Sequence, residues 1–93
     1  MNLQEILRLP DTRIIDVREP YEFEEEHIAG AVNIPLNLIP EHAEEIRQFQ
    51  VPVVLYCRSG NRSGMALRLL SSQGIGDLYN GGGLVDLKEL IKQ

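Results

Sequence analysis

The sequence has a single cysteine, Cys57, and no tryptophan. One cysteine cannot form an internal disulfide, so the fold is not a disulfide-stabilised scaffold, and sulfur chemistry at Cys57 has to be completed on another molecule. With only three Tyr and two Phe in 93 residues, the core has to be built mainly from aliphatic side chains. This length suits one compact domain, which we expect to span residues 1–93.

The sequence also lacks a basic excess and any long apolar run. Its net charge of −5 argues against nucleic-acid binding and against docking on an anionic membrane. No segment approaches the roughly 18 apolar residues that span a bilayer. The N-terminus does not resemble a signal peptide, so we expect a cytoplasmic protein. A periplasmic location fits the same sequence if a native signal peptide has been removed.

Apolar, β-branched segments alternate with amphipathic segments along the chain. The expected strands are residues 13–17, 31–34, 51–56 and 77–79. The expected helices are a short one capped by Asn2, then residues 21–26, 40–49, 63–73 and 84–92. This alternation predicts an α/β sandwich around a mainly parallel sheet. Ligands bind beyond the carboxyl ends of such strands, where Cys57 follows the most apolar one.

The loop after that strand carries the candidate site residues, which are Cys57, Arg58, Ser59, Gly60, Asn61, Arg62 and Ser63. A cysteine between a strand and a helix N-terminus receives backbone N–H groups and partial positive charge. Such cysteines have pKa values of roughly 3.5–7.5 instead of about 8.5. Gly60 permits a tight turn, and Arg58 and Arg62 are able to hold an oxyanion. An inert buried cysteine needs none of these features, so the loop predicts a reactive cysteine that receives anions.

Three ordered motifs resemble those of the rhodanese family of sulfurtransferases. They are residues 16–20 followed by residues 27–35, the loop at residues 57–63, and the glycine motif at residues 80–84. The resemblance extends over nearly the whole chain, from about Ile14 to Leu87. The segment 82–87 is particularly similar to small single-domain members of the phage-shock protein E type. One departure is Leu87, where many members have Trp, and we expect it to act as a smaller apolar filler.

The resemblance implies a three-layer sandwich with a sheet of about five strands. It also implies that the Cys57 thiolate takes the outer sulfur of thiosulfate, or of another sulfane-sulfur donor, and forms a persulfide. A thiol or cyanide then accepts this sulfur, and a thioredoxin-like or persulfide-bearing protein is a further partner to consider. Arg58 and Arg62 would orient the sulfonate. No cofactor is implied, and we expect a monomer or a weak dimer.

Other activities remain as alternatives. Cysteine phosphatases place five residues between Cys and Arg, whereas four separate Cys57 from Arg62, which is tight for a phosphoryl group. The resemblance also implies thiosulfate rather than mercaptopyruvate as the donor, because related enzymes for mercaptopyruvate carry a less basic loop than one with two arginines. A sulfur-carrier module that relays persulfide between proteins is a second hypothesis, and a non-catalytic binding module on the same fold is a third.

The remaining polar residues have simpler interpretations. Asp16 and Arg18 could support the site, and a structural salt bridge is the preferred role. His27 is expected to pack and hydrogen-bond, and His42 to be solvated. Two histidines and one cysteine so far apart have no metal-ligand spacing, so no metal site is expected. The glutamates of residues 19–26 fit a solvated face, and Gly81-Gly82-Gly83 fits a turn.

Overall fold

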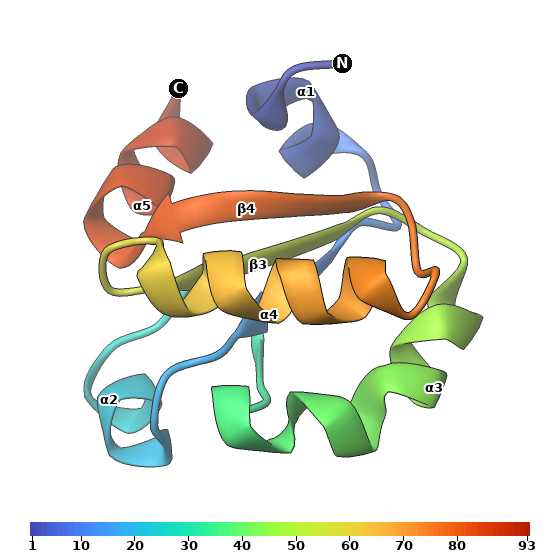
Figure 1. Cartoon of the computed structure of the whole chain (residues 1–93). Helices are drawn as coiled ribbons and strands as arrows, with labels where there is room; N and C mark the ends of the chain where they lie inside the picture. The colour runs from blue at the N-terminus through green and yellow to red at the C-terminus, as the bar shows by residue number, and fades with distance from the viewer.

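The computed structural model describes all 93 residues, and strands alternate with helices from end to end (Figure 1). The elements are α1 (Leu3–Arg8), β1 (Arg13–Asp16), α2 (Pro20–Glu25), β2 (Val32–Asn33), the 3₁₀ helix η1 (Leu36–Leu38), α3 (Ile39–Phe49), β3 (Val53–Cys57), α4 (Asn61–Ser72), β4 (Leu78–Gly83) and α5 (Leu84–Lys92). No helix is both long enough and apolar enough to span a membrane.

The sheet is fully parallel, with the strand order β2-β1-β3-β4. The predicted α/β sandwich is confirmed, but the expected number of about five strands is wrong, because the sheet has four. The N-terminus cannot supply another strand, since Asn2 and Glu5 form a reciprocal capping box that starts α1. Each later connection between strands contains a helix.

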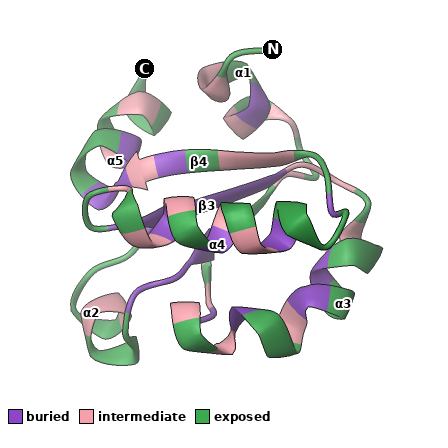
Figure 2. Cartoon of the chain, viewed as in Figure 1, coloured by how far each residue is buried: buried purple, intermediate pink, exposed green.

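Two cores lie on opposite faces of the sheet. Helices α3 and α4 cover one face, and α1 and α5 cover the other (Figure 1). Strand β3 lies between β1 and β4, and all five of its residues are buried (Figure 2). Its side chains alternate between the faces: Val53, Leu55 and Cys57 join the first core, and Val54 and Tyr56 join the second. Cys57 is therefore positioned by the most completely buried strand of the fold.

The glycine motif is part of a strand, so its prediction as a turn is wrong. Strand β4 runs through Gly83, with Leu55 opposite Asn80 and Tyr56 opposite Gly82, which leaves Gly81 as an extra residue at a bulge. A Cβ on Gly81 would come within 2.9 Å of the Val54 side chain. Only glycine therefore lets β4 lie this close to β3.

Other boundaries also differ from the predictions, mostly by one or two residues, and one element is additional. Helix α4 begins at Asn61 rather than at residue 63, so Asn61 and Arg62 belong to its first turn. The 3₁₀ helix η1 was not predicted, because three residues are too few for a periodic pattern. Leu87 is 1% exposed and packs in the core beneath α1 and α5, as expected of an apolar filler.

Candidate active site

The loop after β3 turns sharply at Gly60 and passes directly into α4. Gly60 has a φ of +95°, a conformation that favours glycine, and it stands at the N-cap of the helix. The end of β4 packs tightly on the loop: a Cβ on Gly60 would lie 3.3 Å from the Gly82 Cα, and a Cβ on Gly83 would overlap the Arg58 carbonyl oxygen. Glycine at these positions thus lets β4 close over the loop.

The Cys57 sulfur lies among hydrogen-bond donors. The backbone N–H of Gly60 donates to Sγ at 3.0 Å and that of Ser63 at 3.4 Å, while the Ser63 hydroxyl oxygen lies 3.4 Å away. Burial raises the pKa of the thiol, but hydrogen bonds from Ser63, Ser59 and Gly60 outweigh burial and hold the pKa below its ordinary value. The loop therefore favours a thiolate although Cys57 has no exposed area.

A side chain from β4 completes this cluster. Asn80 Oδ1 accepts hydrogen bonds from the Ser63 hydroxyl at 2.8 Å and from the Gly82 N–H at 2.9 Å. Its Nδ2 donates to the Gly60 carbonyl at 3.1 Å. In the sequence, Asn80 is recognisable only as the first residue of the glycine motif. The one signal for a role of Asn80 is its position between the predicted strand 77–79 and the glycines. That Asn80 lies next to the Cys57 loop follows only from the strand order, which places β4 beside β3.

Arg62 is engaged away from the sulfur. Its guanidinium forms a two-pronged ion pair with the Glu22 carboxylate, at 2.7 and 3.0 Å. Hydrogen bonding from Arg62 is the main reason that the pKa of Glu22 falls to about 2. The pair joins the first turn of α4 to α2. The prediction that the glutamates of residues 19–26 form a solvated face is therefore wrong for Glu22, whose side chain is only 12% exposed because it pairs with Arg62. In the sequence, nothing distinguishes Glu22 from the glutamates around it.

Asp16 and Arg18 form a buried ion pair at the end of β1, with 2.7 Å between Arg18 Nη2 and Asp16 Oδ2. Arg18 Nη2 also donates to the Glu26 carbonyl at 2.6 Å. The structural salt bridge preferred from the sequence is therefore present. Outside the site, His27 stacks on Phe23 and its Nδ1 lies 2.7 Å from the Phe23 carbonyl oxygen.

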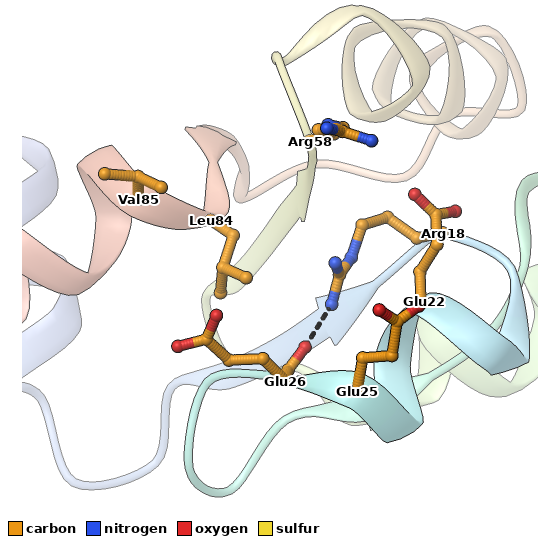
Figure 3. A pocket seen from close by; sticks show the side chains of 7 residues that line it. All are labelled: Arg18, Glu22, Glu25, Glu26, Arg58, Leu84 and Val85. Carbon is orange, nitrogen blue, oxygen red and sulfur yellow. Dashed lines mark hydrogen bonds between the residues drawn. The ribbon is translucent and has the colours of Figure 1, made fainter.

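A small cavity of about 260 Å³ opens beside the loop (Figure 3). Its lining residues are Arg18, Glu22, Glu25, Glu26, Arg58, Leu84 and Val85. Its volume is below the roughly 300 Å³ at which pockets for drug-sized ligands begin, so it suits a small ligand. Cys57 does not line the cavity. The cavity meets the loop at Arg58, an exposed arginine with no ion pair.

The other loop side chains point to solvent. Ser59 and Asn61 are exposed, and their side chains make no hydrogen bonds within the chain. Of the residues predicted for the site, Cys57, Gly60 and Ser63 meet around the sulfur, and Arg58 and Arg18 meet at the cavity. Burial of Cys57 is what an inert cysteine would show, whereas convergence of N–H groups on its sulfur is what an anionic sulfur needs.

The fold and the loop define an α/β protein with a cysteine at the carboxyl end of a parallel sheet, whose thiolate is favoured by hydrogen bonds from the loop. Residues 2–89 match the rhodanese-like domain family. The chain therefore belongs to the rhodanese family, and its predicted placement in this family of sulfurtransferases is confirmed.

Individual relatives agree with this placement. The chain is 40% identical over 74 residues to the thiosulfate sulfurtransferase PspE of Escherichia coli, which covers 78% of the chain and 71% of PspE. It is 48% identical over 68 residues to the uncharacterized protein YqhL of Bacillus subtilis, covering 73% of the chain but only 53% of YqhL. A solved structure described as a rhodanese with anions from E. coli superposes with a TM-score of 0.74 at 39% identity, covering 81% of this chain and 89% of that one.

Proposed function

We propose that the protein is a thiosulfate sulfurtransferase that carries sulfane sulfur as a persulfide on Cys57. The observation that carries this proposal is the convergence of the Gly60 and Ser63 N–H groups on the Cys57 sulfur, beside a cavity where Arg58 has no partner. The name of PspE, a relative at 40% identity, supports thiosulfate as the donor.

The reaction has two displacement steps. The Cys57 thiolate attacks the outer sulfur of thiosulfate, the bond between the two thiosulfate sulfurs breaks, and its electron pair leaves with sulfite. The acceptor, a thiolate or cyanide, then attacks the outer sulfur of the persulfide and releases the Cys57 thiolate. The loop N–H groups stabilise the anionic sulfur in both steps, as an oxyanion hole stabilises developing charge.

Arg58 is better placed than Arg62 to hold the sulfonate. Arg58 lines the cavity and has no carboxylate partner, whereas both terminal nitrogens of Arg62 bind Glu22. Recruiting Arg62 would require breaking a charged pair whose Glu22 side chain is only 12% exposed. We therefore assign donor binding to Arg58 and a tethering role to Arg62.

The test is to incubate the protein with thiosulfate and record its intact mass, with Cys57→Ser as the control. We expect the protein to gain one sulfur atom that cyanide removes as thiocyanate, and the folded variant to gain none. Sulfur uptake only from a protein persulfide would instead indicate a carrier module. If Cys57 neither takes up sulfur nor reacts with iodoacetamide, the non-catalytic binding module is the better description.

A further inference from the structure

The orientation of the Asn80 amide is determined by two backbone groups. The Gly82 N–H can only donate, so the atom it meets at 2.9 Å has to be the amide oxygen. The Gly60 carbonyl can only accept, so the atom it meets at 3.1 Å has to be the amide nitrogen. The Ser63 hydroxyl therefore faces an oxygen that cannot donate, and its own proton points at Asn80.

This arrangement determines the hydrogen bond between Ser63 and the sulfur. With its proton committed to Asn80, the Ser63 oxygen is free only to accept, so the 3.4 Å contact suits a protonated Cys57 that donates its S–H. In the thiol form, hydrogen bonds run from Cys57 to Ser63 to Asn80. Cys57 and Ser63 have no exposed area, so an unpaired S–H would find no water there.

Loss of the proton changes the hydrogen bonding that the sulfur needs. The thiolate accepts hydrogen bonds and cannot donate, and Ser63 is the one side chain that hydrogen-bonds to it. Rotation about the Cβ–Oγ bond turns the Ser63 proton to the sulfur without moving any heavy atom. Asn80 Oδ1 then keeps its hydrogen bond from the Gly82 N–H, so it is not left unpaired.

We propose that Asn80 is a positioning residue for Cys57: it holds the Ser63 hydroxyl while the sulfur is protonated and releases it to the sulfur when the proton leaves. This inference rests on the proposed function in that Cys57 is the sulfur carrier. The exchange lets a buried sulfur change charge with every polar partner still paired. Its cost is the Ser63–Asn80 hydrogen bond, which is lost on forming the thiolate.

Charged groups around the site do not take part in this exchange. They are Asp16 paired with Arg18, Glu22 paired with Arg62, and the exposed Arg58 and Arg68, of which Arg68 lies next to Asn80 over Gly64. None makes a hydrogen bond to the side chain of Ser63 or Asn80. Strand β4 carries no charged residue, and the buried residues of α5 are Leu84 and Leu87. A neutral substitution of Asn80 therefore reaches the sulfur through Ser63.

The loop does not depend on Asn80 to remain in place. The Gly60 carbonyl also accepts the first hydrogen bond of α4, from Gly64 N at 3.0 Å. Asn80 is exposed on the strand, where valine fits well. Asn80→Val thus removes the competition for the Ser63 proton while the helix still holds the turn.

The experiment is a pH titration of Cys57, followed by the ultraviolet absorbance of the thiolate, with Cys57→Ser as the blank. Asn80→Val should lower the thiol pKa by about half a unit, since the thiolate no longer forms at the expense of a neutral hydrogen bond. Asn80→Asp should raise it, because a carboxylate holds the Ser63 proton more firmly and adds negative charge. In a Ser63→Ala background, Asn80→Val should leave the pKa unchanged.

A rise in the pKa with Asn80→Val, or the same shift with and without Ser63, would mean that Asn80 only braces the loop and would overturn the proposal. Asn80→Ala serves as a second neutral variant if the valine variant does not fold. The titration needs no sulfur donor, so it is independent of the sulfur-transfer assay. If the predicted shifts appear but thiosulfate never loads Cys57, the hydrogen-bond exchange stands and the proposed function fails.

Discussion

At the scale of single residues, Cys57 combines burial with a lowered thiol pKa. Burial alone raises the pKa of a thiol, because it disfavours the charged form. At Cys57 the hydrogen bonds from Ser63, Ser59 and Gly60 more than offset this, and they come from the turn that starts α4. No arginine contacts the sulfur directly: Arg62 is paired with Glu22, and Arg58 lies at the cavity. The loop backbone, together with Ser63, therefore stabilises the thiolate.

Substitution of Arg58 tests whether its side chain binds the sulfur donor. We expect Arg58→Ala to lower kcat/KM for thiosulfate about tenfold, because a charge-assisted hydrogen bond contributes roughly 1.5–3 kcal/mol and an exposed one lies at the low end. Arg58→Lys should lose less, since the positive charge remains. Steady-state thiocyanate formation measures both effects. Arg68→Ala is the matched control, because it removes the same charge from an exposed position on α4 outside the cavity lining. Equal losses in both alanine variants would point to net charge rather than to a contact at Arg58.

At the scale of elements, the Arg62–Glu22 pair connects two helices that are remote in sequence. Glu22 lies on α2 and Arg62 in the first turn of α4, forty residues apart. The pair holds α2 near the carboxyl ends of the strands, where Glu22, Glu25 and Glu26 form one side of the cavity (Figure 3). Arg62 thereby shapes the site without touching the sulfur.

This pair predicts a pH-dependent stability. The pKa of Glu22 falls from 4.5 to about 2 on folding, so its contribution is fully present above pH 4.5 and disappears as the pH falls toward 2. Glu22→Gln should destabilise the protein at pH 7 by on the order of 1–2 kcal/mol, less than the full shift implies because Arg62 is partly solvated. Urea unfolding at a series of pH values should show the two proteins converging near pH 2.

The control for this prediction is Glu44→Gln on α3. Glu44 pairs with Arg47 at 3.1 Å, but its side chain is 70% exposed, and exposed pairs contribute little. Its substitution should leave stability nearly unchanged at every pH. A Glu22→Gln variant whose deficit stays constant down to pH 2 would show that the carboxylate is not stabilised by the ion pair.

At the scale of the whole molecule, the two cores share one strand. Leu55 packs with α3 and α4 on one face, while Tyr56 packs on the other and accepts a hydrogen bond from the Ile28 N–H at 3.0 Å. Since Cys57 belongs to the first core, packing between this sheet face and its helices also determines where the sulfur lies.

Truncation of this core has a predictable cost. Leu55 has no exposed area, so Leu55→Ala should lower the free energy of unfolding by roughly 2–5 kcal/mol through lost burial and a cavity. Met65→Ala on α4 is the control, because Met65 is 52% exposed and should change stability by about 0.5 kcal/mol or less. Urea denaturation measures both. Similar losses for the two variants would contradict the assignment of Leu55 to the core.

Local patterns were sufficient for much of the fold. Three local patterns each indicate an element that is present: the capping residue Asn2, the apolar run before Cys57 and the helical spacing of residues 40–49. Each pattern depends only on residues that are close together in sequence. The loop position also followed locally, because parallel strands present their carboxyl ends to ligands. The prediction of a turn at the glycine motif is wrong, because the bulge in β4 can be recognised only from its pairing with β3.

The α/β class, the family and the cysteine loop are all recognisable in the sequence, since they depend on composition, periodicity and contiguous motifs. Tertiary structure decided how the loop residues are used. It paired Arg62 with Glu22, left Arg58 at the cavity and brought Asn80 to Ser63 across seventeen positions of the chain. The physical reason is that these contacts depend on which strands lie side by side, and no local pattern carries the strand order. The hydrogen bonding of the Cys57 sulfur is therefore a property of the folded sheet, at the carboxyl ends of its strands.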